Sequence, residues 1–206
     1  MASRHATHRP GRRRRSAEPP RQSHGFVDPG AMLATAHELP SGLTVRLRLA
    51  RPTDVAQVRA FLERQSAETL SRRFFTAMPR VSDATVRHFT YYDPRTTLIV
   101  AATALIGGAE EVVGLADVAL LGTGLAEIGL LVDEAHRGEG IGRAMSEAVA
   151  WLAVQRGATH LKAEMLDRNV AMLRLMQRLG PTVQTAEGGV STAHTKLPAL
   201  RRAAAA

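Results

Sequence analysis

The residues best suited to chemistry form a short glycine-rich stretch between an apolar strand pattern and an apolar helix pattern. In order they are Arg137, Gly138, Glu139, Gly140, Ile141 and Gly142. Backbone N–H groups and the positive dipole end at a helix start hold phosphates, and glycine lets a phosphate approach without an intervening Cβ. The stretch therefore predicts a pyrophosphate site. The alternative is a flexible loop that merely contains three glycines.

The sequence context of these glycines distinguishes them from two common phosphate-binding motifs. A P-loop ends in Gly-Lys-Ser or Gly-Lys-Thr, whereas Gly142 is followed by Arg143 and Ala144. A dinucleotide-binding fold places its glycines after the first strand of a repeating strand-helix unit. Here the stretch comes late in the chain, after several strands. Coenzyme A is the phosphate ligand that remains.

Apolar periodicity predicts the elements that must position this stretch. Strand-like segments occur at 43–49, 96–102, 112–121, 125–132, 160–165 and 190–197, and helix-like segments at 52–62, 66–75, 82–92, 141–156 and 169–179. The glycine-rich stretch lies between strand 125–132 and helix 141–156. The order of elements predicts an α/β domain with a mixed, mostly antiparallel sheet.

The segment 132–142 resembles motif A of the GNAT acetyltransferases, whose pattern is filled here by Arg137, Gly140 and Gly142. The segment 169–180 resembles the motif B helix of the same family. The resemblance implies a GNAT fold, in which helices cover both faces of the sheet and two strands splay apart. It also implies an N-acetyltransferase that uses acetyl-CoA as its cosubstrate. Because the element order covers 43–197, the resemblance takes in the whole predicted domain.

The resemblance assigns the cosubstrate site residue by residue. Backbone groups of Leu130, Leu131 and Val132 would bond the pantetheine arm between the splayed strands. The glycine-rich stretch 137–142 would hold the pyrophosphate, and Asn169 would face the pantetheine or the adenine.

A finer resemblance, to bacterial protein-lysine acetyltransferases of the Pat type, suggests the acceptor. It is carried by Ser66, Leu70, Arg73, Phe74, Phe75, Ala126, Glu127, Asn169, Met172 and Leu173. Leu70, Phe74 and Phe75 are equally compatible with simple core packing. The resemblance implies acetylation of a protein lysine. The alternatives are a small-molecule amine acetyltransferase, a non-catalytic acyl-CoA sensor, or a nucleic-acid-associated module that uses its arginine arm.

Glu127 is the candidate general base, because a lysine amine with a pKa of about 10.4 must lose a proton before it attacks. Leu125, Gly129 and Leu131 share its strand face, and these apolar neighbours would raise the pKa of a carboxylate there. Pat-type enzymes carry a glutamate at the matching position. The other interpretation of Glu127 is a solvent-paired strand residue.

The general acid is not assigned by the sequence. Many GNAT enzymes use a tyrosine of the motif B helix, but the matching position here is Met176. Water, Tyr91 or Tyr92 could protonate the leaving thiolate, and a thiol with a pKa near 8.5 also leaves fairly well as its anion.

Charge and composition define three regions: a disordered basic arm over 1–40, a GNAT domain over 41–199 and a tail over 200–206. Residues 1–30 hold seven arginines and two acids, so much of the net charge of +8 lies in the arm, which we expect to be a solvated tail without a specific nucleic-acid partner. Translation starting at Met32 would omit most of it. Oligomeric state is left open.

The residue inventory excludes several chemistries. The chain has no cysteine, so disulfides, thiolate metal sites and an acyl-cysteine intermediate are excluded. His136 and His194 show no metal-ligand spacing, and we expect no metal. No apolar run is long enough for a bilayer. We therefore expect a cytoplasmic enzyme that acts on an amine away from any membrane.

Overall fold

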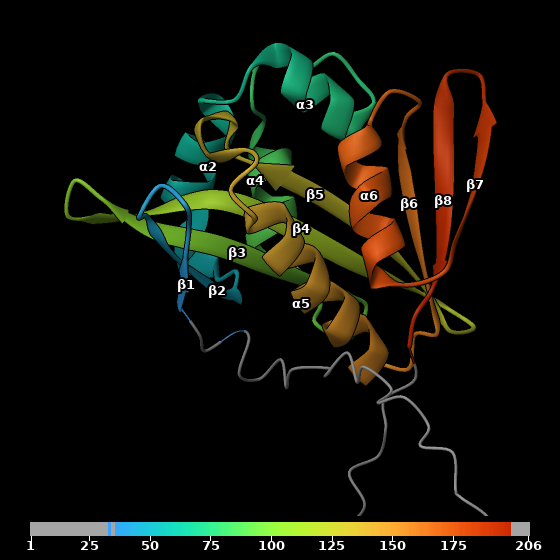
Figure 1. The fold of residues 1–206 in the computed structure, drawn as a ribbon. Coiled ribbons are helices and arrows are strands. Elements are labelled where there is room, and N and C mark those ends of the chain that lie inside the picture. The colour runs from blue at the N-terminus through green and yellow to red at the C-terminus, as the bar shows by residue number, and fades with distance from the viewer. Residues whose placement is uncertain (1–32, 34–35, 199–206) are drawn as a thin grey trace, which may run out of the picture.

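A computed structural model describes residue 33 and residues 36–198 (Figure 1). The strands are β1 (Ala36–Glu38), β2 (Thr44–Leu49), β3 (Thr97–Ile106), β4 (Ala109–Gly122), β5 (Leu125–Val132), β6 (His160–Leu166), β7 (Thr182–Glu187) and β8 (Val190–Lys196). The helices are α2 (Val55–Glu63), α3 (Ala67–Phe74), α4 (Asp83–Thr90), α5 (Ile141–Gln155) and α6 (Val170–Leu179), and the short 3₁₀ turns are η1 (Pro52–Asp54) and η2 (Glu134–His136).

All eight strands form one sheet in the order β1-β2-β3-β4-β5-β6-β8-β7. Every neighbouring pair is antiparallel except β5 and β6, which are parallel. The predicted α/β class and the mixed, mostly antiparallel sheet are confirmed. Each segment expected from apolar periodicity is present, and β5 has the predicted bounds.

Helices cover both faces of the sheet, as predicted. Figure 1 shows α5 and α6 on one face and α2 and α4 on the other. Strand β5 contributes to both cores, because its side chains alternate: Ala126 and Ile128 join the α5/α6 side, and Leu131 joins the α2/α4 side. This two-sided burial fixes the register of the strand that leads to the glycine-rich stretch.

The parallel contact between β5 and β6 is short. Only Leu125, Ala126 and Glu127 pair with β6, opposite His160, Leu161 and Lys162. Beyond Glu127 the register ends, although β5 continues to Val132 and β6 to Leu166. The splayed strand pair is therefore confirmed, and it opens toward the glycine-rich stretch.

Two edge strands were not predicted. β1 pairs with β2 inside the range expected to be a disordered arm, so that expectation is wrong for residues 36–38, and the neighbouring Leu39 is buried. Three residues are too few to show an alternating pattern. β7 was missed because its side chains are mostly exposed and polar. Residues 1–32 and 34–35 of the predicted arm, Met32 among them, and the tail over 200–206 lie outside the described residues.

None of the described helices combines the length and apolar character that crossing a membrane would require.

Candidate active site and cosubstrate cradle

The free edge of β5 is formed by backbone groups of Leu130 and Val132. Asp133 N–H donates to Val113 O of β4 at 2.9 Å. Since backbone groups of successive strand residues point to opposite edges, those of Leu131 also face β4, and those of Leu130 and Val132 face the gap beside β6. Three residues were expected to bond an extended ligand through their backbone groups. Those of Leu131 already face β4 within the sheet and are therefore not free for a ligand.

The glycine-rich stretch turns the chain sharply from η2 into α5. Gly138 and Gly140 have φ angles of +82° and +98°, in the left-handed region that glycine tolerates and other residues rarely adopt. The first helical bond runs from Ala144 N–H to Gly140 O at 3.0 Å. The N–H groups of Ile141, Gly142 and Arg143 have no partner within the helix, so they form the donor set that a phosphate needs.

Gly142 connects this donor set with the gap between the strands. A Cβ placed there would lie 3.5 Å from Leu175 of α6 and 3.6 Å from both Leu130 and Val132. These are ordinary contact distances, so a longer side chain would extend into the space between β5 and α6. The structure thus places the predicted loop and the free edge of β5 side by side.

Arg137 points away from the gap and fastens the loop to α3. Its Nη2 donates to Thr69 Oγ1 at 2.7 Å and lies 3.7 Å from Glu134 Oε1. Glu134 Oε1 also accepts from Ser66, at 2.6 Å from Oγ and 3.0 Å from the backbone N–H. Ser66 in turn caps α3 by accepting from Thr69 N–H. The loop and the start of α3 therefore form one hydrogen-bonded unit.

We predict that Glu134→Gln lowers stability at neutral pH. Hydrogen bonds from the Ser66 and Thr69 side chains, with help from Arg137, lower the pKa of Glu134 from 4.5 to about 2. A carboxylate with a depressed pKa stabilises the fold above its unfolded pKa and loses that contribution as the pH falls through its folded pKa. The difference between wild type and variant should shrink between about pH 4.5 and pH 2, measured by denaturant unfolding. A difference that does not change with pH would contradict this assignment.

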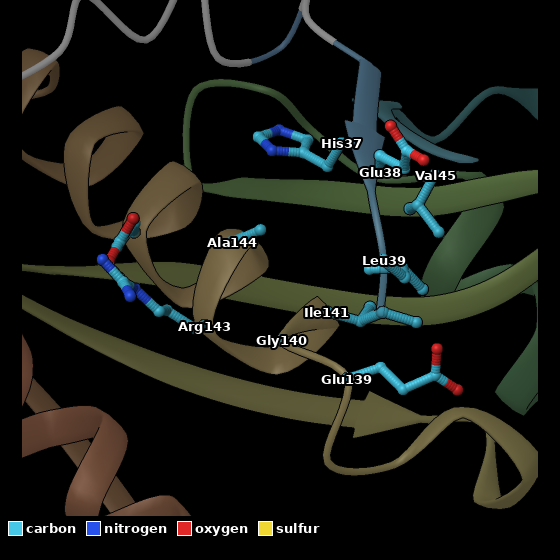
Figure 2. A pocket seen from close by; sticks show the side chains of 10 residues that line it. His37, Glu38, Leu39, Val45, Glu139, Gly140, Ile141, Arg143 and Ala144 are labelled. Carbon is cyan, nitrogen blue, oxygen red and sulfur yellow. The ribbon is translucent and has the colours of Figure 1, made fainter. Parts of the chain in front are cut away.

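A pocket of about 260 Å³ lies on the other side of the loop, between β1 and the first turn of α5 (Figure 2). The Glu139 side chain lines it, accepts from Ser41 Oγ and lies 3.4 Å from His136 Nδ1. These contacts, that of Ser41 first, lower the pKa of Glu139. The pocket does not include Leu130 or Val132 of the β5 edge. The Glu139 side chain therefore points toward β1. Only the backbone of Glu139 contributes to the turn of the glycine-rich stretch.

Glu127 lies where the two strands part, on the sheet face opposite α5. Its Oε2 accepts from Lys162 Nζ of β6 at 3.2 Å, and Lys162 also donates to Glu164 Oε1 at 2.6 Å. The Glu127 side chain is 37% exposed. The expectation that Glu127 has apolar surroundings is wrong. Alternation along β5 identifies neighbours within that strand, but it could not reveal the lysine of the neighbouring strand.

A second carboxylate, Asp117, shares this face. It is diagonal to Glu127, because Asp117 pairs with Gly129 and Glu127 pairs with Ala119. Asp117 forms an ion pair with Arg73 of α3, and its Oδ2 lies 3.9 Å from His88 Nε2. Burial raises the pKa of Asp117, but His88 and Arg73 outweigh burial and the net pKa is lowered. The ion pair joins α3 to β4 and passes over Gly129 of β5.

We predict that Gly129→Ala destabilises the protein by about 1–3 kcal/mol. An added Cβ would fall inside contact distance of the Arg73 guanidinium, which crosses the strand at this glycine to reach Asp117. Arg73 would have to move away from a buried carboxylate, which would then keep only His88 as a partner. The measurement is denaturant unfolding of the four proteins of a double-mutant cycle with Arg73→Ala. Equal costs of Gly129→Ala with and without Arg73 would show that the guanidinium is not the cause.

The remaining predicted residues are placed as follows. Asn169 caps α6 by accepting from Met172 N–H at 3.1 Å through Oδ1. Met176 is fully buried. Tyr92 donates its hydroxyl to Ala50 O at 2.9 Å, and burial raises its pKa, whereas Tyr91 is 60% exposed. Of the two tyrosines, Tyr91 has the accessible side chain.

The Pat-like residues of α3 divide between packing and the site. Leu70 is buried and Phe74 packs against the same core, whereas Phe75 is 44% exposed at a φ of +55°. Ser66 instead contacts Glu134 beside the loop, and Arg73 pairs with Asp117 of β4. Sequence periodicity could identify the first group but not the second.

Across the described ranges, no group of three or more histidine, aspartate or glutamate side chains is arranged to hold a metal ion.

Comparisons with known proteins agree with this arrangement. The model of the acetyltransferase (GNAT) family matches residues 61–180. The crystal structure of the GNAT domain of S. lividans PAT is 31% identical, covers 79% of this chain and 96% of its own, and has a TM-score of 0.70.

Two more distant solved structures share the fold. The Salmonella typhimurium protein yncA, solved with its cofactor acetyl-CoA, is 17% identical over 79% of this chain and 99% of its own, with a TM-score of 0.58. A cAMP-binding acyltransferase from Mycobacterium smegmatis is 24% identical over 79% of this chain and 47% of its own, with a TM-score of 0.54. With a splayed β5–β6 pair, a glycine-rich turn into α5 and a family match over most of the domain, the chain belongs to the GNAT acetyltransferase family.

Proposed function

We propose that this enzyme transfers the acetyl group of acetyl-CoA to the side-chain amine of a protein lysine, with Glu127 as the general base. The observation that carries the proposal is the position of Glu127. Its carboxylate lies at the closed end of the gap whose open end is the glycine-rich loop. A ligand held by its phosphates at the loop and extended along β5 would therefore end beside a base.

The cosubstrate site we propose uses backbone groups of Leu130 and Val132 and the free N–H groups at the start of α5. Gly138 and Gly140 shape the turn, and Arg137 fixes it to α3. Gly142 has no side chain, so it leaves open the passage between β5 and α6. Bound there, acetyl-CoA supplies an activated thioester. The protein-derived chemistry is then the removal of one proton from the acceptor amine, which Glu127 performs directly or through one water.

The acceptor surface favours a polypeptide over a small amine. Next to Glu127, every second residue of β6 and β8 is exposed or half-exposed on the same face: His160, Lys162, Glu164, Thr192, His194 and Lys196. This is an open sheet face and not a closed cavity. Small-molecule sites bury most of their ligand in a concave pocket, whereas an open face beside carboxylates suits a lysine presented by another protein. The similar domain of S. lividans PAT is consistent with this acceptor class.

The test is thiol release from acetyl-CoA in the presence of a panel of small amines, lysine peptides and a protein extract, with products identified by mass spectrometry. We expect turnover with lysine peptides or proteins. Turnover with a small amine alone would favour the small-molecule alternative. Binding of acetyl-CoA without any turnover would favour the acyl-CoA sensor.

A further inference from the structure

Lys162 has an unusual position for one of only two lysines in 206 residues. Its Nζ lies 3.2 Å from Glu127 Oε2, at the last residue pair before β5 and β6 separate. The lysine side chain is 21% exposed, so it lies at the surface of the open face and not in the core. An amine of this chain therefore already lies within hydrogen-bond distance of Glu127. We propose that this same carboxylate removes the proton from the acceptor amine.

The second lysine provides an internal comparison. Lys196 of β8 pairs with His160, while Lys162 pairs with His194 two residues away, so both lysines lie on the same sheet face. Lys196 is exposed, and in the part of the chain that the structure describes it makes no ion pair with a carboxylate. Accessibility alone would favour modification of Lys196, whereas contact with the base favours Lys162.

We propose that Lys162 is a self-acetylation site, modified by the enzyme's own acetyl-CoA. This inference rests on the proposed function, because it uses Glu127 as the base. It adds that the acceptor position beside Glu127 is occupied by a lysine of the same chain when no external amine is present.

The reaction requires that the ammonium first lose a proton. Hydrogen bonds to Glu164 and then to Glu127 raise the pKa of Lys162, so the amine is charged at neutral pH. Glu127 accepts one proton from Nζ, and the free amine attacks the thioester carbonyl carbon of acetyl-CoA. The N–C bond forms and the C–S bond breaks. Coenzyme A leaves as its thiolate and takes up the second proton, which the attacking nitrogen loses as the amide forms, while the first proton passes from Glu127 to water.

Acetylation would change the site as well as mark it. The product amide is neutral, so Glu127 and Glu164 would lose their shared ammonium partner. Glu127 would then be free to pair with the ammonium of an external acceptor. We expect the KM for a lysine peptide to fall several-fold in Lys162→Gln, which resembles the acetylated side chain, relative to Lys162→Arg, which keeps the charge.

The decisive experiment incubates the purified protein with isotopically labelled acetyl-CoA and follows both lysines by peptide mass spectrometry. We expect label at Lys162 to exceed label at Lys196 by at least about tenfold, with a rate constant independent of protein concentration. Glu127→Gln should slow labelling of Lys162 by about 10²- to 10⁴-fold and leave the background at Lys196 unchanged. The inference is equally supported if freshly purified wild-type protein already carries unlabelled acetyl groups on Lys162 and freshly purified Glu127→Gln protein does not.

The outcomes separate this inference from the proposed function. Equal label at the two lysines, unaffected by Glu127→Gln, would mean spontaneous chemical acetylation and would overturn the inference. Acetylation of an external lysine peptide without label at Lys162 would also overturn it, while leaving the proposed function intact. If neither the peptide nor Lys162 is acetylated although acetyl-CoA binds, the proposed function fails first and the inference with it.

Discussion

Glu127→Gln should slow the chemical step by about 10²- to 10⁴-fold at neutral pH while acetyl-CoA still binds. Glutamine keeps the size and polarity of the side chain but cannot take a proton. It can still accept a hydrogen bond from Lys162, which lies 3.2 Å from the carboxylate, so the strand junction should persist. Part of the lost rate should return at alkaline pH, where a lysine acceptor with a pKa near 10.4 supplies more free amine. The measurement is single-turnover transfer to a lysine peptide over a pH range.

Glu164→Gln is the matched control for that variant. Glu164 contacts the same lysine at 2.6 Å, but it lies beyond the last β5–β6 pair. We expect a loss of less than about tenfold from this substitution. Normal turnover by Glu127→Gln would eliminate Glu127 as the base, and loss of acetyl-CoA binding would instead give it a structural role. Equal losses in the two variants would point to the charge of the cluster and not to proton transfer.

Gly142→Leu should remove the stabilisation by acetyl-CoA. At a ligand concentration of 100 times Kd, wild type gains about 2.7 kcal/mol and a higher melting temperature. Position 142 is helical, so leucine causes no left-handed strain, but its side chain would extend toward Leu130, Val132 and Leu175 and fill the passage. We expect affinity to fall by at least about 100-fold, so most of the thermal shift disappears.

Gln155→Leu adds the same side chain to the exposed end of the same helix and should keep the full shift. Direct titration calorimetry with acetyl-CoA measures the affinity of both variants. A full thermal response of Gly142→Leu would show that acetyl-CoA does not pass between β5 and α6. An equal loss in both variants would show that the helix, and not the passage, is being disturbed.

Local patterns predicted the succession of β5, the glycine-rich turn and α5 well because these parts are consecutive in the chain. Strand β5, the turn at Gly138 and Gly140, and the start of α5 follow one another within 125–155. Apolar alternation, glycine and the change to helical periodicity are each visible in a short window. The fold class was predicted for the same reason, whereas the splayed pair was implied by the family resemblance alone.

The acceptor side was predicted less completely because its contacts join distant residues. Lys162 lies 35 positions from Glu127, and Asp117 lies 44 positions from Arg73. Only the sheet order, with β6 placed beside β5, brings the first pair together. Gly129 carries no signal in a sequence pattern, since its role depends on a side chain from α3 that passes over it. Such contacts follow from tertiary packing, which short-range periodicity does not encode.

The short register between β5 and β6 also has a consequence for cooperativity. Three residue pairs, the packing of α5 on α6 and contacts of α3 with β6 connect a half-sheet of β1 to β5 with a half-sheet of β6, β8 and β7. Regions joined by few buried contacts open as separate units with their own free energies. In the ligand-free enzyme, amide hydrogen exchange in β6, β8 and β7 should therefore report a lower opening energy than in β3 and β4. A cosubstrate lying in the gap between β5 and β6 would contact both half-sheets. The enzyme would therefore unfold as one cooperative unit only when cosubstrate is bound.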